Sequence, residues 1–192
     1  MKRARGVTLV EVMVTLAAIG ILLAMAAPGL ADMINRRRTL AVAEQLMTDI
    51  AYARAETGRR NQALSITFNK DASQTCYTIY YASAARLCNC TGGEGRACIY
   101  FQKVYPDMEV RTVKLPTSQG VTVIPDPLHW ASENGDQTLN FVLPQLTALP
   151  ADAVVDIRGT SGAHLRLQVN QMGRVSLCSA EQNFGGVAPC PP

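Results

Sequence analysis

The stretch that decides the fold lies near the N-terminus, where residues 6–28 read GVTLVEVMVTLAAIGILLAMAAP. From Val7 to Ala27 this run is apolar except for two threonines, one glutamate and one glycine. As an α-helix it would be about 31 Å long, which matches the hydrocarbon core of a bilayer. Three of the first five residues are Lys or Arg, and such a basic flank keeps an N-terminus in the cytoplasm. The run therefore predicts a membrane-spanning helix with the rest of the chain on the far side.

A cleaved signal peptide and a plain signal anchor are the two simpler interpretations of this run. It is longer than the apolar core of a signal peptide, and Ala24 to Ala27 matches a signal peptidase site only loosely. Glu11 argues against a plain anchor, because a carboxylate inside the bilayer costs about 3 kcal/mol or more. An anchor gains nothing from this carboxylate, so the sequence favours a specific function for Glu11.

The segment Gly6-Val7-Thr8-Leu9-Val10-Glu11 resembles the type III leader site of type IV pilins and of the pseudopilins of type II secretion. The resemblance implies that a prepilin peptidase cuts after Gly6 and methylates the new N-terminus at Val7. It also implies that Glu11 is an assembly determinant. Pro28 stands where the family has a proline, whereas Val7 replaces the more usual Phe. In a fibre, the carboxylate of Glu11 can pair with the α-amino group of a neighbouring Val7, which specifies the register between subunits.

The helix is expected to continue in a second, amphipathic half, so that Val7 to Arg60 would form one long, kinked helix of about 80 Å. Pro28-Gly29 breaks the backbone hydrogen bonding, Asp32 is a good N-cap, and Gly58 with the polar residues after it ends the helix. An apolar stripe at helical spacing predicts packing against the chain's own domain, with Glu44, Asp49, Tyr52 and Glu56 facing away from it. The stripe consists of Leu40, Ala43, Leu46, Met47 and Ile50. We therefore divide the chain into a leader (1–6), a transmembrane and assembly helix (7–31), an amphipathic helix (32–60) and a β-rich head (61–192).

Beyond residue 60 the hydrophobic period changes to two, which is typical of antiparallel strands. The predicted fold class is α+β, with a long N-terminal helix packed on a β-rich, sandwich-like head, as in the GspH/FimT-type branch of the pilin family that the chain resembles. The expected strands are Leu64–Phe68, Tyr77–Tyr81, Ile99–Gln102, Glu109–Lys114, Val121–Ile124, Leu139–Leu143, Val154–Arg158, Leu165–Val169 and Val175–Cys178.

Six cysteines lie in the head, on the oxidising side of the membrane, and their even number predicts disulfides. Cys178 and Cys190 are distant from the others and close a short loop, so we pair them. The remaining four are expected to form two bridges in which the near neighbours Cys88 and Cys90 take different partners, Cys76 and Cys98, with the connectivity left open. A zinc site is the alternative, but it is disfavoured because there is no C-x-x-C pair and no histidine nearby.

No catalytic arrangement is evident. The chain has two histidines, His129 and His164, and Gly159-Thr160-Ser161-Gly162 lacks the second spaced glycine of a nucleophile elbow. Gly92-Gly93-Glu94-Gly95 lacks the Lys-Ser/Thr that follows in a phosphate-binding loop. We therefore expect no catalytic residue, no metal and no cofactor, and interpret the protein as the substrate of an enzyme rather than an enzyme.

The segment from His164 to Cys178 predicts a hairpin with Gln171-Met172-Gly173 as its loop. In that register Asn170 faces Arg174, and Arg166 faces Cys178. The outward face then carries a small basic, hydrogen-bonding surface suited to phosphates. This surface consists of His164, Arg166, Gln168, Asn170 and Arg174.

DNA-uptake minor pilins of the FimT type, which the chain resembles, carry a DNA-binding Gly-Arg-x-Arg signature near this place. Here the stretch is Gly173-Arg174-Val175-Ser176, so the second Arg is missing, and Arg166 could replace it in space. An ordinary solvated strand face is the alternative. Bulk charge does not favour nucleic acid, because the formal net charge is only +3 and three of the cations belong to the leader. Arg36-Arg37-Arg38 is interpreted as a solvated or headgroup-facing collar.

Taken together, these features predict a minor pilin of a type IV pilus that primes or caps the fibre, with DNA uptake as a further possible role. The alternative is an H-type minor pseudopilin of type II secretion. Either protein would insert once into the bacterial inner membrane with a periplasmic head and then join a fibre. The expected partners are the prepilin peptidase, the inner membrane, other minor and major pilins or pseudopilins, and DNA.

Overall fold

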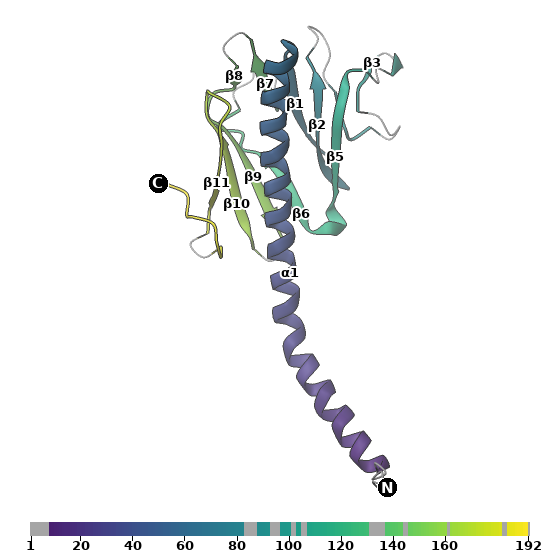
Figure 1. Ribbon diagram of the computed structural model, residues 1–192. Helices are drawn as coiled ribbons and strands as arrows, with labels where there is room; N and C mark the ends of the chain where they lie inside the picture. Colours follow the sequence, from purple (N-terminus) through teal and green to yellow (C-terminus); the bar gives the residue numbers. More distant parts are fainter. Residues whose placement is uncertain are drawn as a thin grey trace, which may run out of the picture.

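A computed structural model describes residues 8–82, 88–92, 97–100, 103–104, 107–130, 137–143, 146–160, 162–181 and 184–191. Helix α1 (Leu9–Arg60) contains 52 residues and is about 78 Å long. Its C-terminal half lies against the β-rich head, and its N-terminal half extends away from the head as an isolated arm (Figure 1). The α+β class predicted from the sequence is confirmed.

Both ends of α1 are capped by side-chain and backbone groups. At the start, the Thr8 hydroxyl oxygen accepts a hydrogen bond from the backbone N–H of Glu11 at 3.3 Å. At the end, Asn61 adopts a left-handed conformation with φ of 51°, and its N–H donates to the carbonyl of Thr57. Asparagine tolerates this conformation better than most residues, so the sequence stops the helix at Arg60.

The single long, kinked helix that the sequence predicts is present, but the expected N-cap at Asp32 is wrong. Helix α1 continues through this region, and Asp32 lies inside it rather than at an N-cap. The segments Leu9–Met25 and Gly29–Arg60 are instead bent by 42° relative to each other. An internal proline such as Pro28 removes one backbone hydrogen bond, which kinks a helix without necessarily ending it. Within the described residues no single straight helix is long and apolar enough to cross a membrane, although the two bent segments together could do so by length and composition.

Two antiparallel sheets form most of the head, with strand orders β5-β2-β1-β7-β8 and β11-β10-β9-β6, and a short β3-β4 pair lies apart from them. Each expected strand overlaps an observed one, whereas β4 and β8 were not expected. The strands are β1 (Leu64–Lys70), β2 (Gln74–Tyr81), β3 (Ile99–Tyr100), β4 (Lys103–Val104), β5 (Glu109–Pro116), β6 (Val121–Pro125), β7 (Thr138–Val142), β8 (Thr147–Leu149), β9 (Ala153–Gly159), β10 (His164–Val169) and β11 (Val175–Ser179), with a 3-10 turn η1 (Thr117–Gln119) between β5 and β6.

The core lies between α1 and the two sheets, because α1 contacts β1 and β7 of one sheet and β6, β9, β10 and β11 of the other. Leu46 and Ile50 of α1 are fully buried, as the apolar stripe predicted. Gly159 at the end of β9 allows a close approach to the helix. A Cβ added there would lie only 2.3 Å from Oγ1 of the buried Thr39, so a larger residue would push α1 away from the sheet.

Candidate functional site

The N-terminal arm of α1 exposes its apolar side chains on all sides. Leu9 and Met25, near its two ends, are 72% and 76% exposed. Glu11 is the only charged side chain on the arm before Asp32, and it also is exposed. Gly6 and Val7, the predicted processing positions, lie outside the described residues. The arm therefore presents one carboxylate on an otherwise apolar helical surface, which suits burial in a bilayer or in a bundle of like helices.

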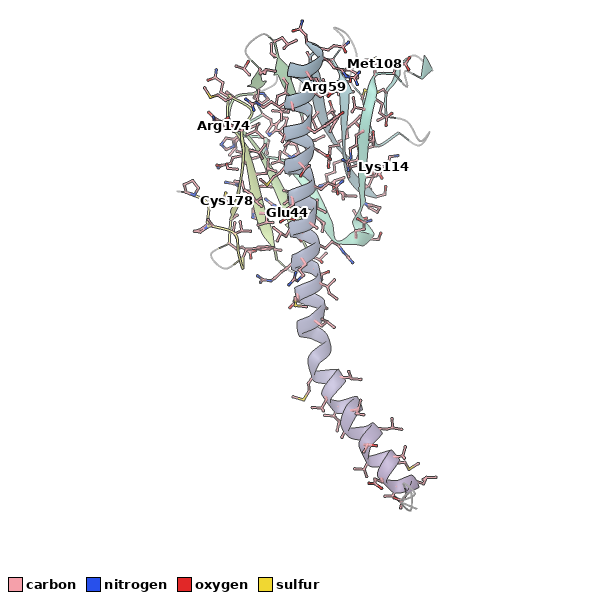
Figure 2. The ribbon with its side chains drawn as sticks, in the orientation of Figure 1. Glu44, Arg59, Met108, Lys114, Arg174 and Cys178 are labelled. Carbon is pink, nitrogen blue, oxygen red and sulfur yellow. A yellow bond between two sulfur atoms is a disulfide. The ribbon has the colours of Figure 1, made fainter. Side chains whose placement is uncertain are left out.

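All six cysteines form disulfides. Cys178 of β11 is joined to Cys190, so the C-terminal segment is tied to the edge of the four-stranded sheet (Figure 2). The other two bridges are Cys76–Cys90 and Cys88–Cys98, and this settles the connectivity that the sequence left open. Among the described residues no group of three or more His, Cys, Asp or Glu side chains could hold a metal ion.

The predicted hairpin of β10 and β11 has the expected register, with Arg166 opposite Cys178 and Gln168 opposite Ser176. Gly173 in its loop has φ of 67°. A Cβ added there would lie 2.8 Å from Cδ of Arg54, so glycine also lets the loop pack against α1. The hairpin tip is thereby fixed relative to the helix.

The expected basic surface on this hairpin is largely neutralised, because Arg166 and His164 both turn toward a buried carboxylate on β9. Nε of Arg166 donates to Oδ1 of Asp156 at 3.1 Å, and Nε2 of His164 lies 3.1 Å from the same oxygen. Arg166 also lies 3.8 Å from a second carboxylate, that of Asp126. Burial alone would raise the pKa of Asp156, but the hydrogen bond from Arg166 and the closeness of His164 outweigh it and hold that pKa below its usual value. Arg166 is therefore committed to an internal ion pair.

Arg174 is placed differently from Arg166 and His164, the other two basic residues of the expected surface. It is exposed, and its guanidinium makes no ion pair with any residue that the structure describes. It lines a shallow cleft of about 350 Å³ across the loops at one end of the four-stranded sheet. The polar side chains of this cleft are His129, Asp152, Gln168, Asn170, Arg174 and Ser176. Sequence reasoning missed Asp152 and His129 here because they belong to loops far from the hairpin in the chain.

Two carboxylates of α1 that were expected to face away from the apolar stripe, Asp49 and Glu56, are in fact buried. The first of them attaches the helix to the head. Asp49 is 1% exposed and accepts hydrogen bonds of 2.7 Å from the hydroxyl of Tyr77 and from the guanidinium of Arg111. Burial and then the hydrogen bond to Asp49 raise the pKa of Tyr77 well above its usual value. Each partner comes from a strand of the five-stranded sheet, so Asp49 links α1 to β2 and β5.

Glu56 lies one turn before the end of α1 and pairs with Arg59 and Arg60. The hydrogen bond from Arg59 and then that from Arg60 lower the pKa of Glu56 to about 2, although burial acts in the opposite direction. The three side chains close the head end of the helix, where cations also interact favourably with the helix dipole.

Comparison with known proteins gives a match to a sequence motif and a likeness of fold. The model of the prokaryotic N-terminal methylation motif matches residues 1–27. A crystal structure of the type IV minor pilin FimU of Pseudomonas aeruginosa matches with 18% identity and a TM-score of 0.51, over 79% of this chain and 98% of that one. A second crystal form of FimU matches with 18% identity and a TM-score of 0.48, over 76% and 98%. A search of curated proteins gave no significant match.

These findings are of different kinds, because one is a match to a sequence motif and the other is a likeness of fold. The motif covers the leader and the apolar arm, whereas the structural likeness, at 18% identity, concerns the fold alone. The chain thus carries the prokaryotic N-terminal methylation motif, and its fold is similar to that of a type IV minor pilin.

Proposed function

We propose that the chain is a minor pilin of a type IV pilus, made as a membrane-inserted precursor and assembled through α1 to prime or cap the fibre. One observation carries the proposal: the N-terminal methylation motif covers residues 1–27, and the helical arm within it extends away from the described part of the head (Figure 1). An apolar surface of this size is unstable in water, so the arm requires a bilayer or neighbouring helices. The role is structural, and no chemistry by the chain itself is part of it.

In this proposal the prepilin peptidase removes residues 1–6 in the bacterial inner membrane and methylates Val7. The head stands in the periplasm and the N-terminus faces the cytoplasm. On assembly, Glu11 of one subunit pairs with the α-amino group of Val7 of a neighbouring minor or major pilin. An unpaired charge in that apolar bundle costs several kcal/mol, so the pair selects one register over its alternatives.

Substitution of Glu11 tests this mechanism. We expect Glu11→Ala to insert normally into the membrane but to be strongly depleted from sheared fibres, as measured by immunoblot of membrane and fibre fractions. Glu44→Ala removes a carboxylate from the exposed face of the same helix and is the matched control (Figure 2). Equal amounts of the two variants in the fibres would contradict the assembly role of Glu11.

A minor pseudopilin of type II secretion would share the leader, the helix and the fold, and would act in a short periplasmic fibre. The two candidates differ in the subunits that they contact. Crosslinking in cells followed by mass spectrometry of the captured subunits separates them, because the first predicts pilins and the second predicts other pseudopilins. Genes adjacent to the one that encodes this chain provide an independent indication.

A contribution to DNA uptake would have to rely mainly on Arg174, because Arg166 is paired with Asp156. If the cleft beside Arg174 binds a DNA phosphate, Arg174→Gln weakens DNA binding about tenfold at low salt. The slope of the logarithm of the binding constant against the logarithm of the salt concentration then falls in magnitude by about one. Lys114→Gln removes a cation from the other sheet and is the control. An electrophoretic shift isotherm that Arg174→Gln leaves unchanged would exclude this role.

A further inference from the structure

A groove of about 460 Å³ opens where α1 leaves the head, between the helix and the C-terminal segment. Its apolar side chains are Met33 and Leu40 of α1 and Phe184, and Gly29 and Gly185 line it as well. Its charged side chains are Asp32, Arg36 and Arg37. The groove therefore combines an apolar floor with two cations and one carboxylate.

The two arginines of the groove are held differently. The guanidinium of Arg36 lies 5.9 Å above the ring of Phe184, which is itself 5% exposed, so Arg36 is fixed against the floor. Arg37 is exposed at the rim. The next residue, Arg38, does not line the groove and instead donates to the carbonyl of Gln119 at 3.0 Å. Three consecutive arginines thus serve two different faces of the helix.

The groove lies directly above the apolar arm. Leu30, Met33 and Ile34 are each about half exposed and continue the apolar surface of the arm up to the groove. Side chains on an α-helix tilt toward its N-terminus, so Arg36 and Arg37 lean back toward the arm. When the arm spans a bilayer, these two guanidinium groups face the level of the lipid headgroups.

From this placement we infer that the groove binds one anionic glycerophospholipid of the membrane in which the precursor waits for assembly. The lipid phosphate pairs with Arg37 and Arg36, and an acyl chain lies along Met33 and Leu30. The inference rests on the proposed membrane insertion of α1. The arm of a second subunit is the other conceivable occupant. Its one carboxylate, Glu11, pairs with the α-amino group of Val7 in the proposed fibre, which leaves the two cations of the groove unmatched, whereas a phosphate pairs with both.

The test uses the full chain reconstituted into phosphatidylcholine bilayers that contain a small fraction of phosphatidylglycerol. Insertion is first measured as resistance to carbonate extraction from vesicles of phosphatidylcholine alone. The protein is then extracted in mild detergent, and retained phosphatidylglycerol is quantified by native mass spectrometry. Arg37→Gln and Arg38→Gln have the same net charge, and only Arg37→Gln removes a cation that lines the groove, so Arg38→Gln is the matched control.

We expect wild type and Arg38→Gln to retain phosphatidylglycerol, and Arg37→Gln to retain it about tenfold less, as for the loss of one charge-assisted hydrogen bond. Arg37→Lys should recover part of the difference. Equal losses in the two glutamine variants would indicate bulk attraction of anionic lipid and would overturn the proposed lipid site. Retention of phosphatidylglycerol by none of the proteins, or a second copy of the chain bound in the groove, would also overturn it. Failure of wild type to insert into phosphatidylcholine would overturn the membrane-inserted precursor as well.

Discussion

Removal of the Asp49 carboxylate should weaken the attachment of helix α1 to the head. In Asp49→Ala, the buried hydroxyl of Tyr77 loses its acceptor and Arg111 loses its ion pair. A buried hydroxyl without a partner costs about 1–3 kcal/mol. The side chain of Arg111 is 49% exposed, so the loss of its pair adds no more than about 1 kcal/mol. We therefore expect the free energy of unfolding to fall by about 1–4 kcal/mol.

A double-mutant cycle with Tyr77→Phe identifies the source of this loss. Tyr77→Phe alone should cost about 1.5–3 kcal/mol, because it removes a hydrogen bond to a charged acceptor. The double variant should then cost at least about 1 kcal/mol less than the sum of the single changes. The assay is urea denaturation of the detergent-solubilised chain, followed by circular dichroism. Glu44→Ala, on the exposed side of the same helix, should change stability by less than about 0.5 kcal/mol. Additive costs in the cycle would refute the link between Asp49 and Tyr77.

Three further predictions concern the packing of α1 against Gly159, the pH dependence of stability and the Cys178–Cys190 disulfide. Gly159→Ala should destabilise the head by about 1–3 kcal/mol in denaturant, because its Cβ meets Thr39, and adding Thr39→Ala should recover most of the loss. The lowered pKa of Glu56, about 2, means that its pairing stabilises the fold above the usual pKa and that this contribution is lost as the pH falls from about 5 toward 2. Glu56→Gln should accordingly flatten the acid limb of a stability–pH profile. Replacing Cys178 and Cys190 by serine opens a loop with a sequence separation of 12, which should cost about 3 kcal/mol in the same denaturation assay. A double-serine protein as stable as wild type would show that the Cys178–Cys190 disulfide does not stabilise the head.

The parts of the fold that depend on local pattern were predictable from the sequence. Alternation from His164 to Asn170, with Gly173 in the turn, defines the register of the β10–β11 hairpin, and the observed pairs are those that the pattern required. The apolar stripe on α1 likewise identified Leu46 and Ile50 as buried. In each case the relevant neighbours lie within about a dozen residues, so the spacing alone carries the information.

The electrostatic partners were not predictable in the same way, because they depend on which elements meet in space. Asp49 faces Arg111, which is 62 residues further along the chain, and nothing in the helical pattern shows that a cation covers this position. The pairing of Arg166 with Asp156 could have been predicted from the strand register. The two residues lie opposite each other in the β9–β10 hairpin around Gly162, and extending the register to β9 would have revealed it.

The central claim is that the chain is processed as a prepilin and enters a fibre through its N-terminal helix. N-terminal sequencing and intact mass measurement of the protein recovered from sheared fibres test it most directly. We expect a chain that begins at N-methylated Val7 and keeps the whole apolar arm. Fibre fractions without the protein, a chain that still carries residues 1–6, or a head cleaved after Ala27 would contradict it.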